Sequence, residues 1–208
     1  MASNPKHYYT LEEYLALERE SETRYEYWHG EVFAMSGGTL RHDLAMDNVF
    51  ALLRAQLGQR ECHVFSSNRQ IKVPAAPPYR YADGSVVCGK IEVERFNGND
   101  ILINPVLLYE VLSPSTEAYD RGDKFTYYKS IPTFTKYLLI AQHRPHVTQF
   151  LKHSDTEWTQ REYNDLGAVI ILTSIDCTLA LSEIYRNVSL SSVSSVPGLT
   201  EYDIIRLR

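Results

Sequence analysis

One apolar segment constrains the fold more than any other part of the chain. Residues 105–112 read PVLLYEVL, and their one acid is Glu110. A run that is apolar at almost every position is typical of a strand buried on both faces, so other layers must cover both sides of its sheet. An ionised carboxylate in such a strand costs several kcal/mol unless it is paired or bound to a cation. Glu110 therefore predicts a metal site or a buried ion pair.

A second acid and a lysine lie in segments of similar character. Asp83 lies within YADGSVV at 81–87, and Lys124 lies within DRGDKF at 120–125. If the two acid-bearing strands pair, both carboxylates can point to one end of the sheet. Carboxylate oxygens suit Mg²⁺ or Mn²⁺, and such an ion polarises a phosphate oxygen and activates water. The pattern predicts a metal-dependent phosphodiesterase site, with a Glu110–Lys124 ion pair as the alternative.

Hydrophobic periodicity predicts a mixed α/β sheet with helices on its faces. A capping box, Thr10 with Glu13, marks the start of the first helix. We expect one domain over residues 1–188, and a Ser-rich tail or docking segment over 189–208. The expected helices are 11–20, 40–57, 121–130 and 181–186; the expected strands are 24–28, 31–35, 62–73, 80–88, 105–112, 136–141, 145–152, 157–163 and 168–172, with a loop at 89–104.

The bulk properties exclude several classes of protein. The net charge of the 208 residues is −5, which gives no overall attraction to nucleic acid, so DNA binding needs a local basic patch or a partner. No apolar run approaches the ~20 residues of a membrane helix, so we expect no membrane partner. Cys62, Cys88 and Cys177 lie far apart without a CxxC pair, which predicts reduced cysteines and a cytoplasmic location.

Four strings resemble the Uma-two family of bacterial restriction-endonuclease-like proteins, in the PD-(D/E)XK nuclease superfamily. They are YEYWHGEVFAMSGG at 25–38, RHD at 41–43, YADGSVVCG at 81–89 and PVLLYEVLSPSTEAYDRGDKFTYY at 105–128. The resemblance covers about residues 8–188. It implies a restriction-endonuclease-like core, helix-strand-strand-strand-helix-strand, with added antiparallel strands and an N-terminal helix. It also implies a Mg²⁺- or Mn²⁺-dependent endonuclease that hydrolyses DNA.

The family motif assigns roles by position. Asp83 matches the aspartate of the PD motif, and Glu110 matches the acid of (D/E)XK. Leu112 stands where the motif has lysine, so the resemblance implies that Lys124, on the following helix, takes that role. Gly84 replaces the apolar β-branched residue usual in the family, and we expect it to loosen the strand that orients Asp83.

Other residues complete the expected site. A family acid follows the tight turn at Glu31, which makes Glu31 the expected third acid and Glu26 the alternative. His42, at the start of the main helix, is expected to contact phosphate or orient a ligand, and Arg121 to add positive charge. The expected catalytic set is Asp83, Glu110, Lys124, Glu31 and His42, and the expected metal ligands are Asp83, Glu110 and Glu31.

Three functions remain open at this stage. The first is a DNA endonuclease, which we expect to work as a homodimer because superfamily members that cut both strands often do so. The second is a nuclease-fold binding or scaffold protein with weak or no cleavage, and the third is a metal-dependent phosphohydrolase with another substrate. A nuclease requires the acids and lysine around one point facing an open groove, whereas a scaffold closes them into an ion-pair network.

Overall fold

The computed structural model describes residues 7–21, 23–28, 30–34, 38–75, 79–96 and 98–190. Most of the expected tail at 189–208 lies outside the described residues, as does the last residue of the expected strand 31–35. The elements, in chain order, are α1 Leu11–Glu20, β1 Tyr25–Trp28, β2 Glu31–Ala34, α2 Leu40–Leu57, β3 Cys62–Ser66, β4 Gln70–Lys72, β5 Tyr79–Tyr81, β6 Gly84–Cys88, β7 Val93–Phe96, β8 Asn99–Leu102, β9 Leu107–Leu112, α3 Glu117–Tyr119, a π-helical turn Asp120–Lys124, α4 Phe125–Tyr128, β10 Lys136–Ala141, β11 Val147–Lys152, β12 Trp158–Tyr163, β13 Val169–Leu172, a 3₁₀ turn Thr173–Ile175, β14 Cys177–Ala180 and α5 Leu181–Ile184.

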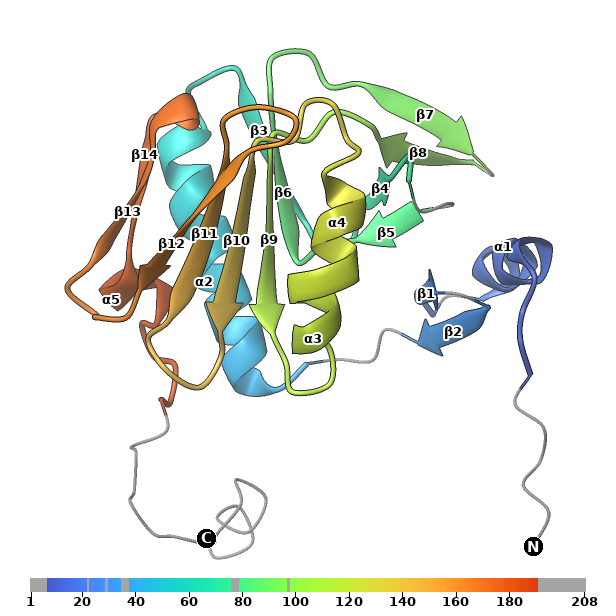
Figure 1. The fold of residues 1–208 in the computed structure, drawn as a ribbon, viewed down its shortest axis with the longest axis horizontal. Coiled ribbons are helices and arrows are strands. Elements are labelled where there is room, and N and C mark those ends of the chain that lie inside the picture. Colours follow the sequence, from blue (N-terminus) through green and yellow to red (C-terminus); the bar gives the residue numbers. More distant parts are fainter. Residues whose placement is uncertain are drawn as a thin grey trace, which may run out of the picture.

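A six-stranded mixed sheet forms the centre of the molecule, in the order β12-β11-β10-β9-β6-β3 (Figure 1). The pair β9–β10 is parallel, and the other neighbours are antiparallel. The succession α2, β3, β6, β9, α3–α4 and β10 reproduces the expected helix-strand-strand-strand-helix-strand core. The predicted mixed α/β fold with added antiparallel strands is thus confirmed.

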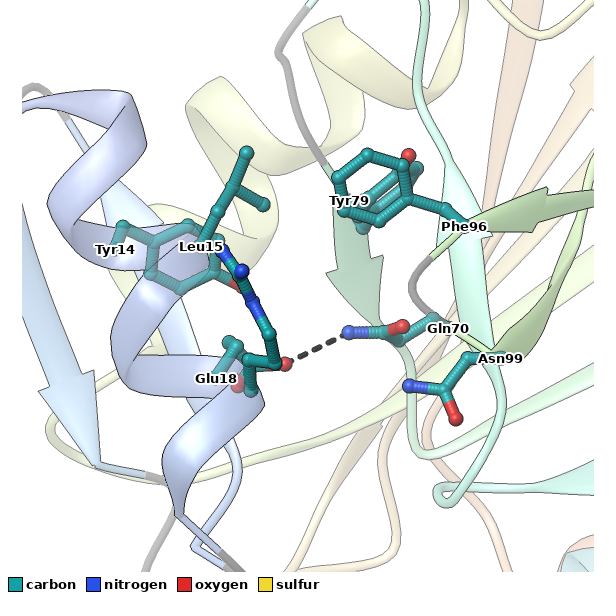
Figure 2. A pocket seen from close by; sticks show the side chains of 8 residues that line it. Tyr14, Leu15, Glu18, Gln70, Tyr79, Phe96 and Asn99 are labelled. Carbon is teal, nitrogen blue, oxygen red and sulfur yellow. Dashed lines mark hydrogen bonds between the residues drawn. The ribbon is translucent and has the colours of Figure 1, made fainter.

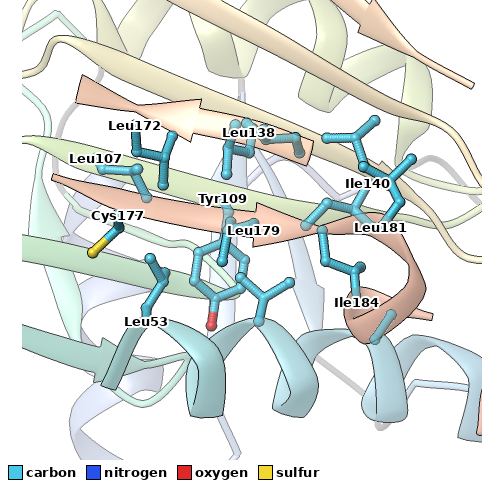
Figure 3. Packing of buried hydrophobic residues seen from close by; sticks show 14 of the residues in the cluster. Leu53, Leu107, Tyr109, Leu138, Ile140, Leu172, Cys177, Leu179, Leu181 and Ile184 are labelled. Atoms are coloured by element: carbon cyan, nitrogen blue, oxygen red, sulfur yellow. The ribbon is translucent and has the colours of Figure 1, made fainter. Parts of the chain in front are cut away.

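Strand β9 is buried along its whole length, as its sequence predicted. Leu107, Tyr109 and Val111 belong to the cluster that α2, α5 and the β13–β14 hairpin form on one face of the sheet (Figure 3). Leu108 and Leu112 belong to the cluster on the opposite face, beneath α4. Because side chains alternate along a strand, Glu110 projects to the α4 side.

Several smaller elements differ from the prediction, and β14 has no counterpart among the expected strands. The expected strand 80–88 is two strands, β5 and β6, and Asp83 occupies the bend between them. The expected strand 62–73 likewise divides into β3 and β4. The expected loop 89–104 contains the β7–β8 hairpin, which joins β4 and β5 in a second, four-stranded sheet. The sequence did not predict this hairpin because β7 carries charged residues between its apolar ends. An edge strand needs little apolar surface.

Gly84 does not loosen its strand, contrary to expectation. It lies directly opposite Tyr109 in the β6–β9 pair, and a Cβ atom at position 84 would lie 2.2 Å from Tyr109 Cζ. The tyrosine ring therefore occupies the space that a side chain at position 84 would need. This close approach requires glycine at position 84, and it allows β6 to pack directly against β9.

Two cysteines are paired, which corrects the expectation of reduced cysteines. Cys62 and Cys88 face each other across β3 and β6 and form a disulfide bond, whereas Cys177 is free and buried. The two cysteines are 26 residues apart in the sequence, so their spacing did not predict a disulfide bond. The antiparallel register of β3 and β6 brings them together. Within the described part of the chain, no helix has the length and apolar character needed to cross a membrane.

Candidate functional site

Asp83 and Glu110 are held together by reciprocal backbone hydrogen bonds. The Val111 amide donates to Asp83 Oδ2 at 2.7 Å, and the Asp83 amide donates to Glu110 Oε2 at 3.3 Å. These bonds continue the β6–β9 pairing past the start of β6, so the bend that carries Asp83 is fixed against the middle of β9. The structure thus brings the first two predicted residues together.

Lys124 reaches the same point from the helical segment after β9. Its Nζ lies 3.0 Å from Glu110 Oε1, 3.4 Å from Asp120 Oδ1 and 3.6 Å from Glu26 Oε1. The π-helical turn buries both Asp120 and Lys124. A π turn is rare and occurs most often at functional sites. Lys124 thus contacts Glu110 across a sequence separation of 14 residues, as the resemblance implied.

Glu26 is the hairpin acid that contacts the lysine. It lies on β1, and its Oε1 also accepts a hydrogen bond from the Tyr81 amide at 3.1 Å. Glu31 lies farther along the same hairpin, opposite Trp28. These contacts favour Glu26 as the third acid, which was the alternative in the sequence analysis, and the role of Glu31 stays a prediction.

His42 borders the cluster from the start of α2. The Thr39 side chain caps this helix and donates to Gln142 Oε1 at 2.5 Å, and Gln142 donates to the Leu112 carbonyl at 3.0 Å. This chain of bonds fixes the helix start beside the end of β9. His42 Nε2 then lies 3.3 Å from Asp83 Oδ2. Burial opposes a charge on the imidazole, but the hydrogen bond and charge of Asp83 raise the pKa of His42 overall.

Negative charge dominates this cluster. Three carboxylates, those of Glu110, Asp120 and Glu26, lie within 3.6 Å of the Lys124 ammonium, and Asp83 adjoins them through the bond of its amide to Glu110. Burial raises the pKa of Glu110 well above its ordinary value; Lys124 lowers it, and the neighbouring acids raise it further. Burial likewise raises the pKa of Asp120. Burial opposes the charge on Lys124, but the surrounding acids hold its pKa well above the ordinary value.

The residues of the cluster fit a hard divalent cation. Excess carboxylate charge in a poorly solvated site is relieved by such an ion, and the donors are oxygens, as Mg²⁺ prefers. Among the described residues, no group of three or more His, Cys, Asp or Glu side chains forms a ready-made metal cage. Mg²⁺ does not require one, because it commonly binds through one or two carboxylates, waters and substrate phosphate. Asp83 and Glu110 would serve as those two carboxylates.

Two members of the cluster were missed in the sequence, and one expected member is absent. Asp120 lies four residues before Lys124, a spacing that places side chains on one helix face and was its available signal. The Tyr128 hydroxyl donates to Glu110 Oε1 at 3.1 Å, and the sequence analysis did not include this residue in the site. Arg121 bonds instead to Glu117 at 2.8 Å and to Thr148 at 3.2 Å, which are contacts of a structural kind.

A family described as "Uma2: Putative restriction endonuclease" matches residues 11–182. The chain belongs to the Uma2 family. The motif resemblance found in the sequence is thereby confirmed. Two relatives of this Uma2 chain come from Synechocystis sp.. The uncharacterized protein slr1290 of Synechocystis sp. is 32% identical over 178 residues, 86% of this chain and 92% of that protein. The uncharacterized protein sll1609 of the same organism is 31% identical, over 74% of this chain and 86% of its own length.

A solved structure shares the Uma2 fold found here. It is the crystal structure of a "putative nuclease belonging to DUF820" from Anabaena variabilis, with a TM-score of 0.67 and 18% identity. The match covers 85% of this chain and 97% of that one. At this identity the likeness establishes the fold.

Proposed function

We propose that this Uma2 protein is a Mg²⁺- or Mn²⁺-dependent endonuclease that hydrolyses DNA phosphodiester bonds. One observation carries the proposal: the bend after β5, the middle of β9 and the π-helical turn place Asp83, Glu110 and Lys124 in one cluster. Two acids and a lysine around one point are the groups that metal-assisted phosphoryl transfer requires. The family membership supports the same reaction class.

Each residue has a role that follows from its surroundings. Asp83 and Glu110 would hold the ion, which supplies a polarised phosphate oxygen and a water of lowered pKa. Lys124, kept charged by the acids around it, orients the attacking water and offsets phosphate charge. His42 contacts the phosphate, since Asp83 holds its imidazole beside the metal ligands. Glu26 is our third acid, with Glu31 as the alternative.

The direct test is nicking of supercoiled plasmid and cleavage of single-stranded DNA with Mg²⁺ or Mn²⁺. Asp83→Asn and Glu110→Gln keep the shapes of the side chains and should abolish cleavage, and Lys124→Met should reduce it about 10²- to 10³-fold, as loss of one preorganised charge does. Asp123→Asn is the matched control, because Asp123 is an exposed acid next to Lys124 and should leave the rate unchanged. Equal cleavage by the wild type and Asp83→Asn would refute the proposal.

One observation favours a second candidate, a non-catalytic binding or scaffold protein with the nuclease fold. The side chains of Lys124 and Glu110 are each only 5% exposed and lie 3.0 Å apart. Such a pair also serves to hold structural elements in register. A scaffold would show no cleavage with either metal, whereas Lys124→Met would still lower its melting temperature.

We also infer a homodimer, carried over from the sequence analysis; the cytoplasmic location expected there rested on reduced cysteines and loses that support, because Cys62 and Cys88 are paired. One chain has a mass of 23.9 kDa, so light scattering distinguishes monomer from dimer directly. A chain with one active site needs a second copy to cut both DNA strands, and this is the reason to expect a dimer. A monomer that linearises plasmid in one binding event would contradict the inference. Fractionation of the native cells tests the location.

A further inference from the structure

A cavity separate from the acid–lysine cluster lies between α1 and the four-stranded sheet. Its volume is about 220 Å³. Figure 2 shows Tyr79 and Phe96 together on one side, Tyr14, Leu15 and Glu18 of α1 on another, and Gln70 and Asn99 beside the sheet. The rings of Tyr79 and Phe96 have centroids 5.3 Å apart. The cavity thus combines aromatic surface with side-chain amides.

This lining suits one flat heterocycle with polar edges. Sites for drug-sized molecules measure roughly 300–1,000 Å³, so this cavity takes a smaller ligand. Aromatic side chains stack on nucleobases whatever their sequence, and amide side chains pair with the donors and acceptors on base edges. Arg19, exposed at the rim, supplies the positive charge that an attached phosphate requires.

The polar groups of the cavity are already oriented. Glu18 Oε1 accepts a hydrogen bond from the Tyr25 amide at 2.6 Å, and Glu18 Oε2 accepts bonds from Gln70 Nε2 at 2.8 Å and the Tyr81 hydroxyl at 3.3 Å. Glu18 therefore organises the site. Its bond to the Gln70 nitrogen fixes that amide and leaves the acceptor oxygen of Gln70 outside this bond. Asn99 offers both a donor and an acceptor.

Short connections join this cavity to the candidate active site. Tyr81 donates through its hydroxyl to Glu18 and through its amide to Glu26, which contacts Lys124. Tyr79 precedes Asp83 by four residues, a span of at most about 13 Å in an extended chain. That distance equals about four stacked nucleotides at 3.4 Å each. A base and a phosphate of the same strand can therefore occupy the two sites together.

We propose that the cavity binds one unstacked nucleobase of the DNA strand whose phosphate lies at the acid–lysine cluster. The proposal rests on the proposed nuclease function and narrows its substrate class to single-stranded or locally opened DNA, because a paired base cannot enter. Stacking against Phe96 and Tyr79 provides affinity, and Gln70 and Asn99 contact the base edge. The net charge of −5 makes such local contacts necessary, since general attraction to DNA is absent.

Photocrosslinking tests the site directly. The full chain is mixed, in EDTA, with single-stranded oligonucleotides that carry one 5-iodo-deoxyuridine at successive positions, and the crosslinked residue is identified by mass spectrometry. We expect crosslinks at Phe96 or Tyr79. Phe96→Leu should abolish the crosslink at position 96 and weaken oligonucleotide binding about tenfold, within the range measured for loss of one stacked base. Asn99→Asp, at an exposed position that tolerates substitution, should weaken binding similarly.

The controls separate this proposal from the nuclease proposal. Phe50→Leu, on α2 beside Arg54, makes the same change far from the cavity and should leave binding unchanged. Crosslinks confined to other residues, or equal affinity of Phe96→Leu and the wild type, would overturn the base site. Equal labelling by the free nucleoside 5-iodo-deoxyuridine would overturn the assignment to a DNA strand. Crosslinking at Phe96 without plasmid cleavage would overturn only the nuclease function.

Discussion

Two buried tyrosines should respond oppositely to the same substitution. Tyr109 and Tyr128 are both fully buried. The Tyr128 hydroxyl donates to Glu110 at 3.1 Å, whereas the Tyr109 hydroxyl has no hydrogen-bond partner within the described residues. An unsatisfied buried polar group costs about 1–3 kcal/mol, and a hydrogen bond to a charged group contributes about 1.5–3 kcal/mol. Tyr109→Phe should therefore raise the unfolding free energy by about 1–3 kcal/mol, and Tyr128→Phe should lower it by about 1.5–3 kcal/mol.

Chemical denaturation in metal-free buffer measures both effects. The two variants lose the same single oxygen and keep the ring that fills the core, so cavity terms nearly cancel between them. The midpoint should move up for Tyr109→Phe and down for Tyr128→Phe, with unchanged slopes. A fall in stability for Tyr109→Phe would show that its hydroxyl has a partner, and equal values for both variants would refute the reasoning.

Three further predictions concern the same cluster and its supporting strand. Lys124→Met should cost about 3–5 kcal/mol, because it leaves a buried carboxylate unpaired, and adding Glu110→Gln should restore part of this loss in thermal melts. Gly84→Ala should lower the melting temperature, since its Cβ would lie 2.2 Å from a ring atom of the facing tyrosine; unchanged melting would contradict that packing. Because Asp83 raises the pKa of His42, their pair stabilises the fold fully below about pH 6.5 and loses this contribution as the pH rises through the folded-state value. NMR titration in EDTA should find that raised pKa, and Asp83→Asn should lower it.

The sequence was sufficient to predict the central layer of the molecule. An apolar run with strand length predicted β9, and the helical periodicity of residues 40–57 predicted α2 within its observed bounds. These elements are strongly patterned because they are buried against several others. The motif resemblance then identified Asp83, Glu110 and Lys124, whose convergence depends on strand pairing that no local pattern encodes.

The remaining features depend on contacts between distant segments. The disulfide follows from the β3–β6 register, which places Cys62 opposite Cys88, and the role of Gly84 follows from the ring opposite it. Asp120 joins the cluster because the π turn at 120–124 buries it together with Lys124 beside β9. The contact of Glu26 with Lys124 depends on the position of the β1–β2 hairpin, which sequence spacing left undetermined.

The π-helical turn also makes the position of the lysine depend on chain length. The wider turn accommodates one residue more than an α-helical turn, so every later side chain is displaced by about 100° around the axis relative to an uninterrupted helix. A regular α-helix over the same residues would therefore rotate Lys124 away from Glu110 without changing any side chain of the cluster, whereas deletion of the exposed Gly122 would remove the extra residue together with the wide turn and leave the lysine on the same face. Because the lysine that contacts Glu110 comes from this turn and not from position 112, comparisons based on the fixed spacing of the strand motif would overlook relatives built in the same way.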